Sequence, residues 1–304
     1  MKNKYKYGTS QLFNFAQDSY LERTSRPIYA VAFLLPFIVF YEIGTIFINT
    51  NVLRHYWQGR VVAFSWLQRL LEYLGFGSKL AWLATPLAVV VILIALQLAS
   101  RKRWRLWVGD IWPMAVECVL LAVPLIVLGL FLNSPVRPWG DIEQVTDNSI
   151  QVRIDLPSCS SPANDRTPTA ADSSNGSQPT RLLADIVTSI GAGIYEELVF
   201  RLILICLLML LFQDVLRFNH KNSVILSVLV SAALFSAYHH IDFLSGQLYQ
   251  TEPFSWMKFA FRTIAGVYFA VVFAIRGFGI TAGTHTFYDV IATIINTAFF
   301  SGQN

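Results

Sequence analysis

The sequence RLLADIVTSIGAGIYEELVFRLILICLLMLLF, residues 181–212, is mainly apolar over a length that exceeds one membrane crossing. A helix needs roughly 20 apolar residues to cross a hydrocarbon core of about 30 Å. As one straight helix this stretch would be about 48 Å long, so it must tilt, bend or protrude. Gly191 and Gly193 offer a place for a bend or for the close approach of a neighbouring helix.

The rest of the chain has a similar character. Of its 304 residues, 54% are hydrophobic and only 14% are charged, which is too apolar to cover a soluble surface. We therefore expect an all-α polytopic transmembrane helical bundle of about seven to eight spans. Residues 61–75, which include Arg69 and Glu72, are too short for a crossing and predict an interfacial or re-entrant helix. The expected spans are residues 27–49, 80–99, 112–132, 181–212, 223–239, 257–275 and 280–300.

The net charge of +4 is explained by orientation in a membrane rather than by a nucleic-acid partner, because the basic residues flank the apolar runs. Such residues precede the first run and follow the second, which predicts a multi-pass protein of the cell membrane with a cytoplasmic N-terminus. The first run is too long for the core of a cleaved signal peptide and is expected to stay as an anchor. The basic residues are Lys2, Lys4, Lys6, Arg23, Arg26, Arg101, Lys102, Arg103 and Arg105.

Residues 133–180 differ from both flanks because they hold six of the twelve prolines and a long run of small polar residues. This composition predicts a disordered insertion. It divides the chain into a three-span membrane region, residues 1–132, and a four-span region, residues 181–304, which contains every deep cluster of ionisable residues. Three scattered cysteines, Cys118, Cys159 and Cys206, predict no disulfide framework.

The first such cluster is Glu196, Glu197 and Arg201, which the surrounding apolar residues hold at membrane depth. Charges there cost several kcal/mol unless they are paired or hydrated. On a helix Glu197 and Arg201 share a face and can neutralise each other, whereas Glu196 points about 100° away. An interhelical polar clamp would explain one ion pair, but the second glutamate makes a chemical role the stronger interpretation.

Two further clusters follow, FSAYHH with His239 and His240, and HTFYD with His285 and Asp289 on one helical face. Together the three segments offer Glu, His and His-Asp, a set suited to holding and deprotonating water. Straight-helix counting nevertheless sets His239 near the outer end of its span and His285 about 9 Å from the cytoplasmic end of another. By that count the two imidazoles would lie at different depths.

In their order, these motifs resemble the CPBP intramembrane protease family, which includes type II CAAX prenyl endopeptidases and bacteriocin-processing and immunity proteins. The family pattern EExxxR, FxxxH and HxxxN or HxxxD corresponds to residues 196–201, 235–239 and 285–289. The resemblance implies an intramembrane endopeptidase in which Glu196, helped by His239, activates water without a metal. It also implies that His285 and Asp289 stabilise the oxyanion and that Glu197 and Arg201 support the first motif.

Asp289 departs from the asparagine variant of the pattern, because an ionised carboxylate cannot donate to an oxyanion. We expect Asp289 to orient His285, or to stay protonated. The expected substrate is a peptide or protein at the lipid bilayer, either a CAAX-like tail or a leader peptide, and no nucleic acid is expected. The pattern leaves two alternatives open. One is a divalent metal such as zinc on Glu196, His239 and His285, and the other is a non-catalytic scaffold, immunity protein or transporter.

Overall fold

The computed structural model describes residue 16 and residues 18–51, 62–133, 178–242, 247–248 and 255–300. Nearly all of these residues are helical, which confirms the all-α prediction. The described exceptions include two antiparallel strands of two residues each, β1 (Ile241–Asp242) and β2 (Gln247–Leu248). In chain order the helices are α1 (Tyr20–Thr24), α2 (Pro27–Asn51), α3 (Val62–Tyr73), α4 (Ser78–Ser100), η1 (Val108–Asp110), α5 (Ile111–Asn133), α6 (Gln178–Glu197), η2 (Leu198–Leu204), α7 (Ile205–Met209), η3 (Leu210–Val215), α8 (His220–Tyr238), α9 (Trp256–Arg276) and α10 (Phe278–Phe300).

Within the described part of the chain, six helical segments are long and apolar enough to cross a membrane. They correspond to six of the seven expected spans. The seventh, residues 280–300, does form the helix α10, but its buried threonines together with His285 and Asp289 lower its hydropathy. Chain length and composition thus support a multi-pass membrane protein.

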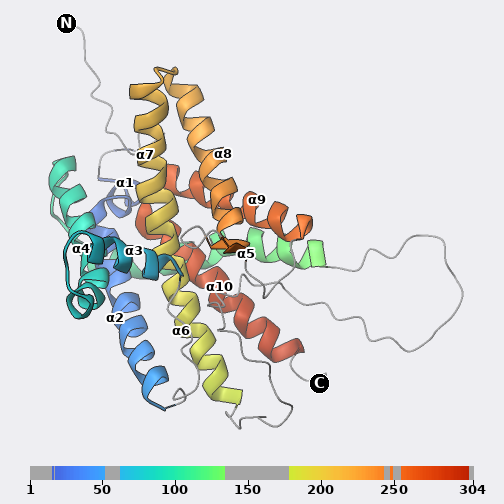
Figure 1. Cartoon of the computed structure of the whole chain (residues 1–304). Helices are drawn as coiled ribbons and strands as arrows, with labels where there is room; N and C mark the ends of the chain where they lie inside the picture. Colours follow the sequence, from blue (N-terminus) through green and yellow to red (C-terminus); the bar gives the residue numbers. More distant parts are fainter. Residues whose placement is uncertain are drawn as a thin grey trace, which may run out of the picture.

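The stretch that was too long for one crossing forms a continuous helical rod from α6 through η2 and α7 to η3 (Figure 1). Its apolar part, Leu182–Val215, is 34 residues, or about 51 Å at the α-helical rise. Beyond the middle of the rod, α8 returns alongside α7 as a helical hairpin. The excess length is therefore accommodated by protrusion of the α7–α8 hairpin (Figure 1).

The rod contains two π-helical segments, η2 and η3, in which the backbone is wound more widely than in an α-helix. Such segments leave carbonyl groups without their ordinary partners, and they are found frequently at functional sites. In η2 the carbonyl oxygen of Phe200 accepts a hydrogen bond of 2.7 Å from the hydroxyl of Ser231 in α8. This bond satisfies a buried carbonyl and fixes α8 against the motif-bearing part of the rod.

The C-terminal helix α10 passes through the middle of the bundle and packs against α6, α5, α2 and α9 (Figure 1). Glycine permits its closest crossing: a Cβ on Gly193 in α6 would meet the backbone nitrogen of Thr286 in α10 at 2.5 Å. Gly191 is in a similar position against the ring of Tyr41 in α2. Of the two roles predicted for these glycines, close approach of neighbouring helices is the one that the structure supports.

Residues 61–75, predicted to form a short interfacial or re-entrant helix, contain the 12-residue helix α3, which is too short to cross a bilayer. Its apolar side, with Ala63, Phe64 and Leu67, is buried in the bundle. It packs across α4 and α6 and brings Trp66 against the ring of Tyr238 in α8, with ring centroids 5.0 Å apart. The α3 helix therefore covers one side of the motif-bearing region.

Ion pairs join the basic segments that were expected at one membrane surface. Arg103, after α4, lies 3.1 Å from Asp18, and Arg23 in α1 lies 2.9 Å from Asp110 in η1. Hydrogen bonds to Asp110 raise the pKa of the Arg23 guanidinium above its ordinary value. The segment before α2 and the segment after α4 thus meet at the same end of the bundle, as the charge pattern requires.

At that end Arg276, the last residue of α9, is buried in a network of its own. It binds both carboxylate oxygens of Glu117 in α5, the hydroxyl of Thr24 and the carbonyl oxygen of Leu21. Its guanidinium also lies over the ring of Tyr20. This satisfied network ties α1, α5 and α9 together and has the character of a structural clamp.

The predicted disordered insertion, residues 133–180, falls outside the described residues except at its edges. Asn133 ends α5, and residues 178–180 belong to the first turn of α6, so the helical region begins three residues before the predicted boundary at residue 181. The division of the chain into residues 1–132, 133–180 and 181–304 stays a prediction. In the structure, α2 and α5 from the first region pack directly on α10 from the last.

Candidate active site

The three sequence motifs meet inside the bundle where α6 passes into η2, beside the end of α8 and the first half of α10. Five of their polar side chains are almost inaccessible to solvent, with exposed fractions of 3% or less. His239, at the C-terminal cap of α8, is partly exposed. The five buried residues are Glu196, Glu197, Arg201, His285 and Asp289.

Glu197 and Arg201 form the predicted ion pair, with Arg201 Nε 3.1 Å from Glu197 Oε2. Both residues are buried, at 0% and 1% exposure. Arg201 Nη2 also lies 3.4 Å from the carbonyl oxygen of Gly266 in α9, and its guanidinium carbon lies 4.3 Å from the ring centre of Phe235 in α8. The pair thus connects the rod to both α8 and α9.

Glu197 has a second partner that the sequence did not indicate. Its Oε1 accepts a hydrogen bond of 2.7 Å from Nδ1 of His285 in α10. Because a carboxylate only accepts hydrogen bonds, Nδ1 of His285 carries a proton. Glu197 therefore orients the imidazole of the third motif as well as the arginine of the first.

The other imidazole nitrogen of His285 faces two more carboxylates. Nε2 lies 3.4 Å from Asp289 Oδ2 on the same helix and 4.0 Å from Glu196 Oε2. The short contact with Asp289 agrees with the four-residue spacing that set the two on one face. Oδ1 of Asp289 is buried and has no hydrogen-bond partner among the described residues.

Glu196 faces Tyr238 of α8 and His285 of α10. Its Oε1 lies 3.5 Å from the hydroxyl of Tyr238, a long hydrogen bond from the residue just before His239. Sequence reasoning did not select Tyr238, although it stands inside the quoted FSAYHH motif. Its ring is 2% exposed and packs against Phe200 and His239.

The tautomer of His239 follows from its backbone contact. Its Nδ1 lies 2.9 Å from the carbonyl oxygen of Phe235, one turn earlier in α8. A carbonyl can only accept, so Nδ1 is the donor and, in the neutral ring, Nε2 carries the lone pair. Nε2 is buried and has no hydrogen-bond partner within the described structure. This nitrogen is ready to accept a proton from a small molecule such as water.

Straight-helix counting set His239 and His285 at different depths, whereas the family resemblance required them to lie together, and the structure agrees with the resemblance. The ring of Phe235 lies between them, with its centroid 5.1 Å from that of His239 and 6.1 Å from that of His285. Straight-helix counting failed because it assumed that α8 and α10 both cross the full membrane from its surfaces. Instead, α8 begins on the protruding hairpin and ends inside the bundle, beside the first half of α10 (Figure 1).

Aromatic rings enclose the polar centre. One of them, Phe269, was not indicated by any pattern in the sequence. Phe269 of α9 stacks on the imidazole of His285, with centroids 4.5 Å apart and an interplanar angle of 19°. It also lies 5.5 Å from the guanidinium carbon of Arg201. Because these rings exclude water and offer their faces to cations, they favour fixed, well-aligned polar contacts in the centre.

In the part of the chain that the structure describes, no group of three or more His, Cys, Asp and Glu side chains is arranged to hold a metal ion. His285 Nδ1 is bonded to Glu197, and its Nε2 faces two carboxylates at 3.4 and 4.0 Å. Binding of a metal by the alternative set of Glu196, His239 and His285 stays a prediction.

Comparisons with known proteins indicate a family for part of the chain. No curated protein and no solved structure matches the chain. A family model described as "Type II CAAX prenyl endopeptidase Rce1-like" matches residues 178–291, from the start of α6 into the second half of α10. The matched region contains all three motifs and the helices that bring them together, which confirms the family resemblance seen in the sequence. Residues 178–291 are thus similar to the Rce1-like type II CAAX prenyl endopeptidases, a family of proteases.

Proposed function

We propose that the protein is an intramembrane endopeptidase that hydrolyses a peptide bond in a membrane-associated substrate, with Glu196 and His239 activating the water. The observation that carries this proposal is the convergence of Glu196, His239 and His285 from three helices on one buried centre. The protease family of residues 178–291 supports the same reaction type. The substrate is proposed to be a CAAX-like tail or a leader peptide.

In the proposed reaction, a water molecule lies between the Glu196 carboxylate and Nε2 of His239. One of these groups accepts a proton from the water as its oxygen attacks the carbonyl carbon of the scissile bond. The proton then passes to the nitrogen of the leaving amine as the tetrahedral intermediate collapses. The fixed tautomer of His239 supports this role, because its Nε2 presents a lone pair into the site.

His285 is proposed to stabilise the oxyanion. As an imidazolium it donates to Glu197 from Nδ1 and keeps the proton of Nε2 for the developing negative charge. Asp289 is proposed to orient His285 from 3.4 Å rather than to contact the oxyanion directly, since an ionised carboxylate would repel it. Glu197 and Arg201 are positioning residues that hold this imidazole and the rod together.

Comparing Glu196→Gln with the wild type tests the proposal. Glutamine keeps the shape but cannot take up the proton, so cleavage of membrane peptides should fall to background while yield and thermal stability are retained. Glu72→Gln in α3, where the glutamate contacts Gln68 on the helix surface, is the matched control and should stay active. Comparative proteomics of membrane fractions from cells with each protein would identify substrates, and cleavage retained by Glu196→Gln would exclude the mechanism.

The two alternatives predict different results. A catalytic metal would make the purified protein sensitive to a chelator such as 1,10-phenanthroline, with activity restored by added zinc. We propose a reaction without metal, in which the chelator has no effect. For a non-catalytic scaffold or transporter, the wild type and Glu196→Gln would give identical membrane proteomes. The proposed location is the cell membrane with a cytoplasmic N-terminus.

A further inference from the structure

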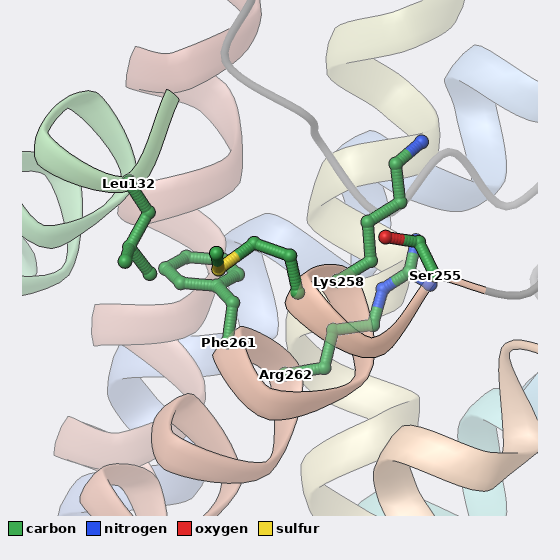
Figure 2. Close-up of a pocket in the computed structure, with 7 residues that line it drawn as sticks. Leu132, Ser255, Lys258, Phe261 and Arg262 are labelled. Carbon is green, nitrogen blue, oxygen red and sulfur yellow. The ribbon is translucent and has the colours of Figure 1, made fainter. Parts of the chain in front are cut away.

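Two groups of cations stand near opposite ends of α5. At its C-terminal end, Lys258 and Arg262 line a pocket between α5 and α9 (Figure 2). Arg262 has a neighbour in the second motif, because its Nη1 lies 3.4 Å from Nε2 of His240. The other group lies about 33 Å away along α5, in the segment that joins α4 to η1. Its members are Arg101, Lys102, Arg103 and Arg105.

The segment 101–107 lies at a membrane surface. The candidate span in α4 ends at Ser100 and the next begins at Val108, so the chain between them connects two crossings. Three tryptophans in or beside this segment are largely exposed, with exposed fractions of 54% for Trp104, 62% for Trp107 and 76% for Trp112. Tryptophan favours the headgroup level of a bilayer, where its ring meets apolar chains and its N–H meets polar groups. The three rings therefore set the segment at the depth of the lipid headgroups.

Most cations of the segment have no acidic partner within the described part of the chain. Asp18 pairs with both Arg26 and Arg103, and Glu22 pairs with Arg26 as well. The two carboxylates nearest the segment are thus already engaged with arginine. Three positive charges are left without an ion pair among the described residues, namely those of Arg101, Lys102 and Arg105.

Lys102 is the least exposed of these three cations. Burial lowers the pKa of its ammonium, and the nearby carboxylate of Glu22 offsets this effect only in part. An anion beside the ammonium would stabilise its charged form. The described residues do not supply that anion, so the segment favours a negatively charged ligand.

Buried polar side chains hold the backbone of the segment in place. Nε2 of Gln97 in α4 donates a hydrogen bond of 3.0 Å to the carbonyl oxygen of Lys102. At the other end, the backbone nitrogen of Trp107 donates to the hydroxyl of Tyr29 at 3.0 Å, and this hydroxyl donates to Asp110. Gln97 and Tyr29 are both 0% exposed. Membrane orientation requires only that the cations lie on one side, so a fixed backbone indicates a further role.

We propose that residues 101–112 form a binding site for the headgroups of anionic phospholipids such as phosphatidylglycerol. The unpaired cations bind the lipid phosphate, and the tryptophans lie against its glycerol and ester groups. Arginine suits this task because its planar guanidinium can bind two phosphate oxygens together. Phosphatidylcholine is disfavoured because its choline carries a positive charge of its own. The inference goes beyond the proposed peptidase function and does not depend on it, since it involves none of the motif residues.

Quenching of tryptophan fluorescence by brominated lipids tests the proposal, because bromine quenches an indole only when the lipid lies against it. The full-length protein is reconstituted into mixed vesicles of phosphatidylglycerol and phosphatidylcholine, with the bromine on one lipid or on the other. Comparing the two gives the affinity of phosphatidylglycerol relative to phosphatidylcholine. A protein with Trp104→Phe, Trp107→Phe and Trp112→Phe gives the quenching of the other five of the eight tryptophans, which is subtracted.

In the wild type we expect the three tryptophans to prefer phosphatidylglycerol about tenfold or more, as the attraction of several cations to an anionic lipid implies. Arg101→Gln combined with Arg105→Gln should bring the ratio close to one, whereas lysine at both positions keeps the charge and should keep most of the preference. The matched control is Arg217→Gln combined with Lys221→Gln, which removes two exposed cations from the α7–α8 hairpin and should change nothing. Equal quenching by both lipids in the wild type, or a preference retained by the double glutamine variant, would overturn the proposal.

A soluble phosphate is the other source of the same anionic group. Millimolar glycerol 3-phosphate should not reduce the preference, because it lacks the acyl chains that hold a lipid against the tryptophans. If it abolishes the preference, the segment takes a soluble phosphate and the proposal is wrong. Raising the ionic strength from about 0.1 M to about 1 M shortens the Debye length from about 10 Å to about 3 Å and should weaken the preference. A preference that salt leaves unchanged would show that charge does not select the lipid, which also contradicts the proposal.

Discussion

Nδ1 of His285 in α10 donates a hydrogen bond of 2.7 Å to Oε1 of Glu197 in α6, and this contact joins the third sequence motif to the first. The other oxygen of Glu197 faces Arg201 at 3.1 Å, so one buried carboxylate serves an imidazole and a guanidinium together. Because the contacts are enclosed by Phe235 and Phe269, loss of any one leaves a polar group stranded in an apolar environment.

The first prediction concerns that carboxylate and its cation. Arg201→Ala should destabilise the fold by about 3–5 kcal/mol, because it leaves the Glu197 charge buried with only His285 to compensate it. The yield of folded protein and the unfolding temperature in detergent would measure this effect. Arg217→Ala, at an exposed arginine after η3, is the control for losing a cation. A stable, fully active Arg201→Ala protein would contradict the supporting role.

The second prediction concerns the crossing of α6 and α10. Gly193→Ala should prevent normal packing, because the added Cβ would lie 2.5 Å from the backbone nitrogen of Thr286, which cannot rotate away. We expect a large loss of folded protein, and any residual protein should have lost activity because the crossing aligns Glu197 with His285. Gly109→Ala in η1, which meets nothing within 4 Å, should be tolerated. Normal stability of Gly193→Ala would show that the helices separate easily.

The third prediction separates two roles for Asp289. Asp289→Ala should reduce kcat by about 100-fold or more, in the range seen when a group that aids an oxyanion is removed. Asp289→Asn should retain much more activity, because the amide keeps the size of the side chain beside His285 and its nitrogen can donate to the oxyanion. Steady-state kinetics on the purified variants would measure the difference. Equal activity of Asp289→Ala and the wild type would remove Asp289 from the site.

The fourth prediction concerns Tyr238, for which the sequence motifs predicted no role. Tyr238→Phe removes the hydroxyl that lies 3.5 Å from Glu196 but keeps the ring that packs against Trp66. We expect kcat to fall by about threefold to tenfold with little change in unfolding temperature, in line with the net value of one hydrogen bond. Tyr268→Phe, which loses a bond to the Leu121 carbonyl outside the site, is the matched control. A larger loss of stability than of kcat would assign Tyr238 a structural role instead.

Local patterns in the sequence were sufficient for several features. The apolar runs predicted the long helices, since crossing a hydrocarbon core requires continuous apolar length. The four-residue spacings predicted the contacts of Glu197 with Arg201 and of His285 with Asp289, because helical geometry sets residues four apart on one face. Three motifs in order were also enough to indicate the protease family whose model matches residues 178–291.

The relative depth of the motifs could not be predicted, because it depends on where each helix begins and ends in space. The long rod lets α8 start on a protruding hairpin, so its end at His239 reaches the level of His285. Contacts between helices could not be predicted either. No spacing rule links Phe269 to His285 or Tyr238 to Glu196, because the partners lie on different helices.

The sequence by itself determined which residues carry charge in apolar surroundings, which of them share a helical face and where the long apolar runs lie. Only the tertiary structure decided that Glu197 binds His285 and that Nε2 of His239 presents its lone pair to the site. The physical reason is that spacing within one helix is fixed by the backbone, whereas contacts between helices depend on close crossings such as Gly193 on Thr286, which only packing of the whole bundle selects.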